Sequence, residues 1–459
     1  MLTLGLLISF LLGFSVLNLI SCYFSLLEKI GLSFIIGIAI QTFLMILLDL
    51  FGCSLTIPNI FEFTLILIVA VNVYCFRRYK IWFQQYRQRH YALPDINGVW
   101  LLFICLIVYL EYMNFSKGMF YPTFDRDSLA GFDTIGWIVS QEHTFRGLSI
   151  FQEDYVTGIH NAGSYITYMP MVQLSYAYVY LLGAETSKII PSLLYLMFLI
   201  SFYAGVRRFV GHTGAAVATF FMFITPEMVG FSSLSGTNVI HAIYASLGIL
   251  YIILWLQNGE KKFLWLSMIL MFGNLWIRNE GIVFTGSVLI LLLGKAWKEK
   301  QYKSFLFYAS ITLLPMIFWL LYMKIVGIYA VNIIISTPFW DQAKMEIIWN
   351  YFKSHWSNSQ YYGWSFTCFI ITLLLNIMNV VRKKDLLNLL MIIFLSVVFY
   401  MILLYQINYL WDSIENVLAY SAKRFLFCFI PLLWLYIVAN RWGKLLFQKL
   451  DQFLSLKKT

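Results

Sequence analysis

Charged residues are scarce in this sequence. Asp, Glu, Lys and Arg make up 12% of its 459 residues, against roughly 25% in soluble globular domains, while hydrophobic residues make up 61%. This composition excludes a fold surrounded mainly by water. Apolar stretches of about 20 residues, enough to cross a hydrocarbon core of about 30 Å, recur between short charged connections. The sequence therefore predicts an all-α polytopic membrane protein with about 11–13 transmembrane helices.

Cysteines are also few, and they form no recognisable pattern. The six cysteines lie in or beside apolar segments, without the spacing of a zinc site or a disulfide framework. We expect them to be small packing residues. Internal repeats, Gly/Ser linkers and low-complexity tracts are absent as well. The first apolar stretch, Leu2–Ile20, lacks the basic region and cleavage site of a secretory signal, so we expect a retained helix.

About thirteen segments are apolar and long enough to span the membrane, give or take one or two. They are expected near Leu2–Ile20, Ile30–Leu50, Phe61–Phe76, Val99–Tyr112, Ile189–Tyr203, Ala215–Glu227, Val239–Leu256, Phe263–Trp276, Ile282–Leu293, Phe305–Lys324, Phe366–Val381, Leu386–Tyr405 and Phe425–Ala439.

The charges are divided unequally between the two sides of this expected bundle. One set of connections carries 22 of the 32 Lys and Arg residues but six of the 22 Asp and Glu residues. By the positive-inside rule this side is cytoplasmic, and the N-terminus lies outside. The net charge of +10 is explained by this distribution, so no nucleic-acid partner is expected. Richness in Ile, Phe and Lys favours a bacterial inner membrane.

We expect one membrane domain with short flanking parts. These are N-terminal helices with a basic loop over 1–98, the main membrane domain over 99–440 with an outer loop at 114–188, and a basic cytoplasmic tail over 441–459.

The outer loop has the pattern of a small helical cap. Phe132, Ile135 and Val139 recur at helical spacing, which predicts an amphipathic helix that stops at Gly147. A second helix is expected to begin near Pro170.

Three acids, Asp125, Asp127 and Asp133, lie close together in this loop. Asp125, Arg126 and Asp127 resemble the acid-x-acid pattern that holds a divalent metal and a nucleotide diphosphate, but nucleotide sugars are cytoplasmic and this loop is expected outside. A carboxylate here could instead act as general base on a hydroxyl. Asp127, followed by Ser128, would also suit an ordinary helix N-cap. Because Asp127 and Asp133 would point to different faces of one helix, we expect one of them to be the base.

Other charged residues are candidates for substrate binding. Arg278 and Glu280 lie in a hairpin close to the membrane, where charges are costly and tend to mark function, although an internal ion pair would also explain them. Lys423 and Arg424 oppose the positive-inside trend, and an arginine there could bind a phosphate or merely anchor headgroups. The full candidate set is Asp125, Glu142, His143, Glu153, Asp154, His160, Arg278, Glu280, Lys423 and Arg424. No metal ligands are assigned, and a divalent metal is left open.

The order of these features resembles the GT-C class of membrane glycosyltransferases, which includes protein O-mannosyltransferases and the aminoarabinose transferases that modify lipid A. The matching residues are an acid, an aromatic residue and a glycine in the first outer loop, a tyrosine-proline neighbourhood, an N-E-G hairpin, and an arginine before a late helix. In order, they are Asp133, Trp137 and Gly147; Tyr165, Tyr168 and Pro170; Asn279, Glu280 and Gly281; and Arg424 before Pro431.

The resemblance implies transfer of a sugar from a polyprenyl-phosphate carrier to a hydroxyl of a protein, lipid or glycan on the outer face, through an inverting reaction. It implies that Asp133 or Asp127 is the base, and that Arg424, or Arg278, holds the phosphate. The chain lacks the paired Trp-Asp motif of oligosaccharyltransferases, which disfavours protein N-glycosylation.

Two other functions stay open. A transporter or flippase of lipid-linked saccharides would more often show internal repeats and broken helices at mid-membrane. A surface polysaccharide polymerase or ligase would place its reactive loop in the second half, around Asp341, Lys344, Glu346 and His355.

Overall fold

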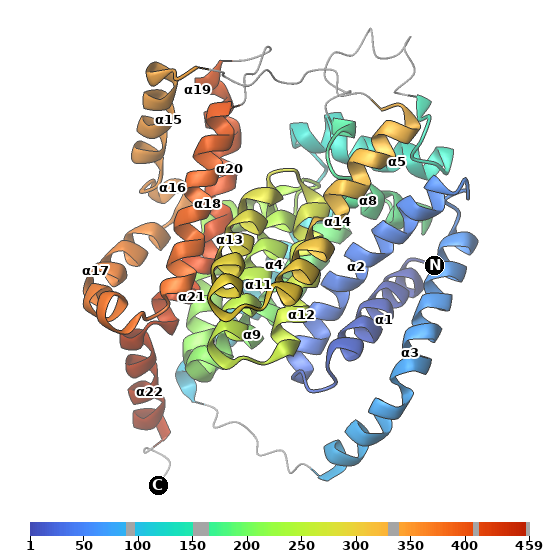
Figure 1. Cartoon of the computed structure of the whole chain (residues 1–459). Helices are drawn as coiled ribbons and strands as arrows, with labels where there is room; N and C mark the ends of the chain where they lie inside the picture. Colours follow the sequence, from blue (N-terminus) through green and yellow to red (C-terminus); the bar gives the residue numbers. More distant parts are fainter. Residues whose placement is uncertain (89–96, 150–164, 329–338, 407–412, 456–459) are drawn as a thin grey trace.

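The computed structural model describes residues 1–88, 97–149, 165–328, 339–406 and 413–455. Over these residues the chain is helical and contains no strand, as expected (Figure 1). Eleven helical segments in the described part are long and apolar enough to cross a membrane, which confirms a polytopic fold and lies within the expected range. They are α1 (Leu2–Ile20), α2 (Leu26–Leu50), the apolar part Ile57–Phe76 of α3 (Ile57–Gln88), α4 (Gly98–Phe120), α9 (Ile189–Phe223), α11 (Asn238–Asn258), α13 (Gly281–Glu299), α14 (Tyr302–Val326), α17 (Ser365–Lys383), α18 (Leu387–Gln406) and the composite segment Ile414–Ala439.

Two of the expected spans lie largely within α9. Ile189–Tyr203 and Ala215–Glu227 lie on either side of Gly211, whose φ of 85° separates two helices. The rings of Tyr195 and Phe223 lie 5.7 Å apart although the residues are far apart in the sequence, so the second helix folds back along the first, and the two spans are distinct as expected. Phe263–Trp276 lies in α12 (Lys261–Ile277), whose 17 residues make it shorter than the eleven spans.

The shorter helices lie mostly between the spans. They are η1 (Ser128–Phe132), α5 (Asp133–Glu142), α8 (Met171–Leu181), α10 (Pro226–Ser232), α15 (Gln342–His355) and α16 (Ser359–Tyr362). The composite segment consists of α19 (Ile414–Val417), η3 (Leu418–Ala422), α20 (Lys423–Leu426), η4 (Phe427–Phe429) and α21 (Ile430–Ala439), and α22 (Arg441–Ser455) follows it.

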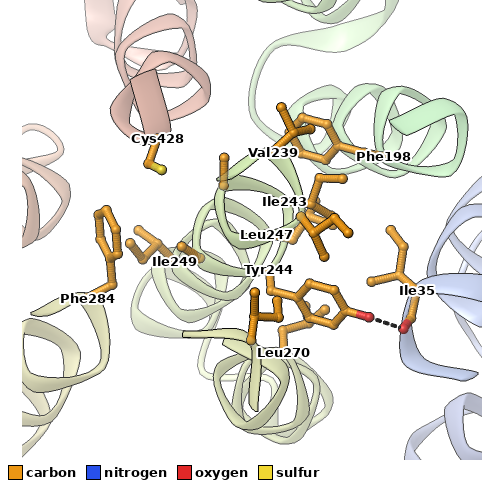
Figure 2. Close-up of a cluster of buried hydrophobic side chains, with 14 of the residues drawn as sticks. Ile35, Phe198, Val239, Ile243, Tyr244, Leu247, Ile249, Leu270, Phe284 and Cys428 are labelled. Carbon is orange, nitrogen blue, oxygen red and sulfur yellow. Dashed lines mark hydrogen bonds between the residues drawn. The ribbon is translucent and has the colours of Figure 1, made fainter. Parts of the chain in front are cut away.

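Helix α11 forms the centre of the core. Among the 18 most apolar consecutive residues of α11, 89% are buried, whereas the corresponding share for α4 is 11%. Helix α11 is therefore enclosed by other helices, while α4 presents most of its side chains outward. Figure 2 shows Val239, Ile243 and Leu247 of α11 packed against side chains of neighbouring helices. The buried hydroxyl of Tyr244 donates a hydrogen bond to the carbonyl of Ile35 in α2.

One end of the bundle carries α5 and α8, and we call it the α5 face (Figure 1). The start of α1 lies there, because the Tyr178 hydroxyl of α8 donates to the Gly5 carbonyl at 2.8 Å. Asp49, near the end of α2, accepts hydrogen bonds from the Thr144 hydroxyl at 2.7 Å and the Tyr322 hydroxyl at 2.5 Å. These contacts attach the segment after α5 to the ends of two long helices. Figure 1 shows α22 at the opposite end.

The two helices expected in the outer loop are present, but one ends early. Helix α5 ends at Glu142, and His143 follows with a φ of 58°, so the expected stop at Gly147 is wrong. A residue other than glycine adopts the left-handed conformation here. Helix α8 begins directly after Pro170, as expected.

Candidate functional site

An ion pair joins the residues just before η1 to the composite segment Ile414–Ala439. Arg424 donates through Nη1 to Oδ2 of Asp127, although the two residues are 297 positions apart. The two side chains remain 22% and 25% exposed, so solvent can reach the pair. Arg424 also lies over the ring of Phe231, with its guanidinium carbon 5.4 Å from the ring centroid. The candidate base and the candidate phosphate-binding residue thus lie in contact.

Irregular helices carry both members of this pair. The π-helix η1 begins at Ser128, directly after Asp127, and the π-helix η3 ends at Ala422, two residues before Arg424. These are the two π-helical segments in the described part of the chain. A π-turn widens a helix locally and is frequent at functional sites.

Two tyrosines lie beside the pair. The Tyr165 hydroxyl donates to Oδ1 of Asp127 at 2.9 Å, and its ring stacks on that of Tyr168 with centroids 6.1 Å apart. Burial, together with the charge of Glu280, raises the pKa of the Tyr168 hydroxyl to about 12. At neutral pH these phenols therefore act as hydrogen-bond donors and flat stacking surfaces.

A second ion pair lies across Tyr168. Arg278 donates to Glu280 through Nη2 at 2.8 Å and through Nε at 3.1 Å, and its guanidinium carbon lies 5.8 Å from the Tyr168 ring centroid. Nη1 of Arg278 donates to Asn238 at 2.5 Å. Burial favours the neutral form of Glu280, but the Arg278 charge outweighs it and lowers the pKa of the Glu280 carboxyl. The hairpin thus contains the internal pair that the sequence left open, and this pair lies next to the first.

Lys423 forms a third ion pair on this face. Its Nζ lies 3.0 Å from Oε1 of Glu227, at the start of α10, and 4.3 Å from the centroid of the Tyr361 ring. The Lys423 carbonyl accepts a hydrogen bond from the Tyr362 hydroxyl at 2.9 Å. Each of the three cations predicted for substrate binding thus has an acidic partner.

Asp133 has a hydrogen-bond partner outside this group. Its Oδ1 accepts a hydrogen bond from the Tyr180 hydroxyl at 2.6 Å. Burial and this contact with Asp133 raise the pKa of Tyr180 to about 12. Asp127 and Asp133 therefore have different partners, in agreement with their expected placement on different helix faces.

The remaining predicted residues have varied positions. Asp125 caps the start of the helix, because its Oδ2 accepts from the backbone N–H and the hydroxyl of Ser128, each at 3.2 Å. The capping role considered for Asp127 thus belongs to Asp125. Glu142 accepts from the backbone N–H of Ser149 at 3.0 Å, and the side chain of His143 is exposed. Predictions for three further residues lie outside the described part: Glu153, Asp154 and His160.

Sequence reasoning missed several side chains that complete this site. Asn238, Glu227 and Phe231 contact Arg278, Lys423 and Arg424 respectively. Asn238 and Glu227 are marked in the sequence only as polar residues near apolar segments, which identifies no partner, and Phe231 has no signal that separates it from the other aromatic residues.

Within the described ranges, no group of three His, Cys, Asp or Glu side chains is arranged to hold a metal ion. Comparison with models of protein families, with curated proteins and with solved structures finds no match to this chain.

Proposed function

We propose that this protein is a membrane glycosyltransferase that moves a sugar from a polyprenyl-phosphate carrier to an acceptor hydroxyl at the α5 face. The observation that carries the proposal is the contact of Asp127 with Arg424 beside Arg278 and Tyr168. An inverting transfer needs a base at the acceptor hydroxyl on one side of the anomeric carbon and a cation at the leaving phosphate on the other side. This arrangement offers both, on helix ends where the headgroup of a lipid carrier can reach.

In the proposed reaction Asp127 removes the proton of the acceptor hydroxyl. The hydroxyl oxygen then forms a bond to the anomeric carbon, and the bond between that carbon and the phosphate oxygen breaks with inversion. The leaving polyprenyl phosphate gains a negative charge, so a guanidinium next to it stabilises the transition state more than the bound donor. Arg424 supplies this cation after exchanging its carboxylate partner for the phosphate.

The aromatic side chains support a sugar substrate. Tyr165 and Tyr168 stack at 6.1 Å, and Phe132 packs edge-on against both. Flat rings beside an acid and two arginines suit a polar ligand with apolar ring faces. The site also favours Asp127 over Asp133 as the base, because Asp127 contacts the candidate phosphate-binding arginine.

The test uses purified protein in liposomes with polyprenyl-phosphate sugars and an acceptor extract. We expect Asp127→Asn to lower the transfer rate about 100-fold or more, the usual range for loss of a general base. Asp125→Asn is the matched control, since asparagine can still cap the helix, and it should retain transfer. Full transfer by Asp127→Asn would refute the assignment of the base.

The rival function is transport of a lipid-linked saccharide. The same liposomes distinguish it, because a labelled donor lipid would cross the bilayer without forming product. Movement of label without turnover of the donor would favour the transporter and would refute the transferase.

A further inference from the structure

A second candidate ligand site lies at the opposite end of the bundle from the α5 face. It is a cavity of about 500 Å³ formed where α11 ends, α12 begins, α13 ends and α14 begins. The other end of α12 leads to Arg278, so the cavity and the site around Arg424 are separated by the length of the helix. Its volume lies in the range of small-molecule pockets.

The charges that line the cavity are mainly positive. Three lysines line it, Lys261, Lys295 and Lys303, and Glu299 is the one acid in the lining. Lys295 already has partners, because its Nζ lies 3.7 Å from Glu299 and 4.3 Å from the centroid of the Trp255 ring. Lys261 and Lys303 are exposed, and the described residues form no ion pair with either. Two lysines are thus available to an anion.

The two free lysines lie at helix starts. Lys261 is the first residue of α12, and Lys303 is the second residue of α14, so free N–H groups lie near both side chains. The ends of α11 and α13 meet the same cavity and carry the opposite partial charge. The lysines, rather than the helix dipoles, therefore account for the attraction to an anion.

The rest of the lining is apolar. It includes Leu264, Met268 and Leu292. The rings of Trp265 and Phe307 also line it and pack edge-on, with their centroids 5.0 Å apart. Trp265 and Phe307 are also exposed, so the apolar wall continues to the outer surface of the bundle. Such a wall is compatible with an acyl chain, whereas a small ionic solute beside it would lose hydration.

From this combination we propose that the cavity binds an anionic phospholipid of the bilayer. The phosphodiester lies between Lys261 and Lys303, and an acyl chain lies along Trp265 and Phe307. Basic pockets between membrane helices are typical binding places for such headgroups. The proposal is independent of the function proposed for the α5 face.

The experiment is native mass spectrometry of the full chain, released from detergent with defined lipids. We expect phosphatidylglycerol to bind at least tenfold more tightly than phosphatidylcholine, and Lys261→Gln/Lys303→Gln to weaken its binding about tenfold. The matched control is Lys298→Gln/Lys300→Gln at the end of α13, which removes the same charge from the same end of the bundle but outside the cavity lining. This control should change the affinity less than about threefold.

Three results would overturn the proposal. Equal affinity for both lipids would remove the role of the headgroup charge. An equal loss in the test and control variants would assign the attraction to general surface charge. Displacement of phosphatidylglycerol by free glycerol 3-phosphate at similar concentration would show that the apolar wall contributes nothing and that the ligand is a soluble phosphate.

Discussion

At the scale of single residues, Tyr165 and Tyr180 offer a matched way to separate the two candidate acids. Each hydroxyl donates one hydrogen bond to one aspartate, Tyr165 to Asp127 and Tyr180 to Asp133. A hydrogen bond to a charged group contributes about 1.5–3 kcal/mol, and 1.4 kcal/mol corresponds to a factor of ten. Which tyrosine matters for turnover therefore reports which carboxylate reacts.

We predict that Tyr165→Phe lowers kcat about tenfold with little change in the KM for the acceptor, because Asp127 loses the donor that fixes its orientation. Tyr180→Phe should change kcat less than about twofold. Steady-state kinetics in liposomes at saturating donor measure both. The reverse order of the two effects would transfer the role of base to Asp133.

The sequence identified the residues of this site better than their partners. Asp127, Arg278, Glu280 and Arg424 stand out because charge near a membrane is costly. The contact of Asp127 with Arg424 could not be predicted, since it depends on the packing of segments 297 positions apart. The Arg278–Glu280 pair, in contrast, could be predicted, because its members are two residues apart in the sequence.

At the scale of helices, the contact between α1 and α2 depends on glycine. A Cβ atom added to Gly13 would lie 1.8 Å from the Ser33 carbonyl oxygen, and one added to Gly37 would lie 1.9 Å from the Ser9 carbonyl oxygen. The two backbones therefore touch without intervening side chains. Small residues commonly allow such close packing between membrane helices.

We predict that Gly13→Ala and Gly37→Ala each lower the free energy of unfolding by about 1–3 kcal/mol, because the helices must separate. Gly294→Ala in α13 is the control, since no atom lies within 4 Å of its added Cβ. It should be neutral or slightly stabilising, because alanine favours the helix. Thermal unfolding in detergent measures all three, and equal midpoints would contradict the close contact.

The helices themselves were largely predictable, but their ends were not. Apolar length fixes where a helix crosses the membrane, so the expected positions of α1, α11 and α18 agree closely with the structure. The stop at His143 arises from local backbone conformation, which apolar periodicity does not report, whereas the break at Gly211 falls between two spans that the sequence separates.

At the scale of the whole molecule, the two ends of the bundle differ in how far their positive charges are balanced by acids. On the α5 face, Arg278, Lys423 and Arg424 each contact an acid. At the opposite end, the lysines around the α13–α14 connection outnumber the acids. An excess of unbalanced Lys and Arg marks the cytoplasmic side of membrane proteins. The α5 face is therefore expected to face away from the cytoplasm.

Cysteine labelling can decide this orientation in cells. In a variant whose six natural cysteines are replaced by serine or alanine, Gln141→Cys tests the exposed side of α5, and Lys298→Cys tests the opposite end. We predict that a membrane-impermeant maleimide labels the cysteine at 141 in intact cells or spheroplasts, whereas the cysteine at 298 reacts only after permeabilisation. Both side chains are exposed, so the labelling of each cysteine depends on its side of the membrane and not on local burial.

This orientation also bears on the choice of donor. Nucleotide sugars are cytoplasmic, whereas a polyprenyl-phosphate sugar can present its headgroup on the far side of the membrane. If the cysteine at 298 reacts in intact cells while that at 141 does not, the α5 face lies with the nucleotide sugars, and the case for a lipid-linked donor fails even if Asp127 is essential. If labelling follows the prediction, the acid and the arginines of the α5 face work where a lipid carrier is the available source of activated sugar.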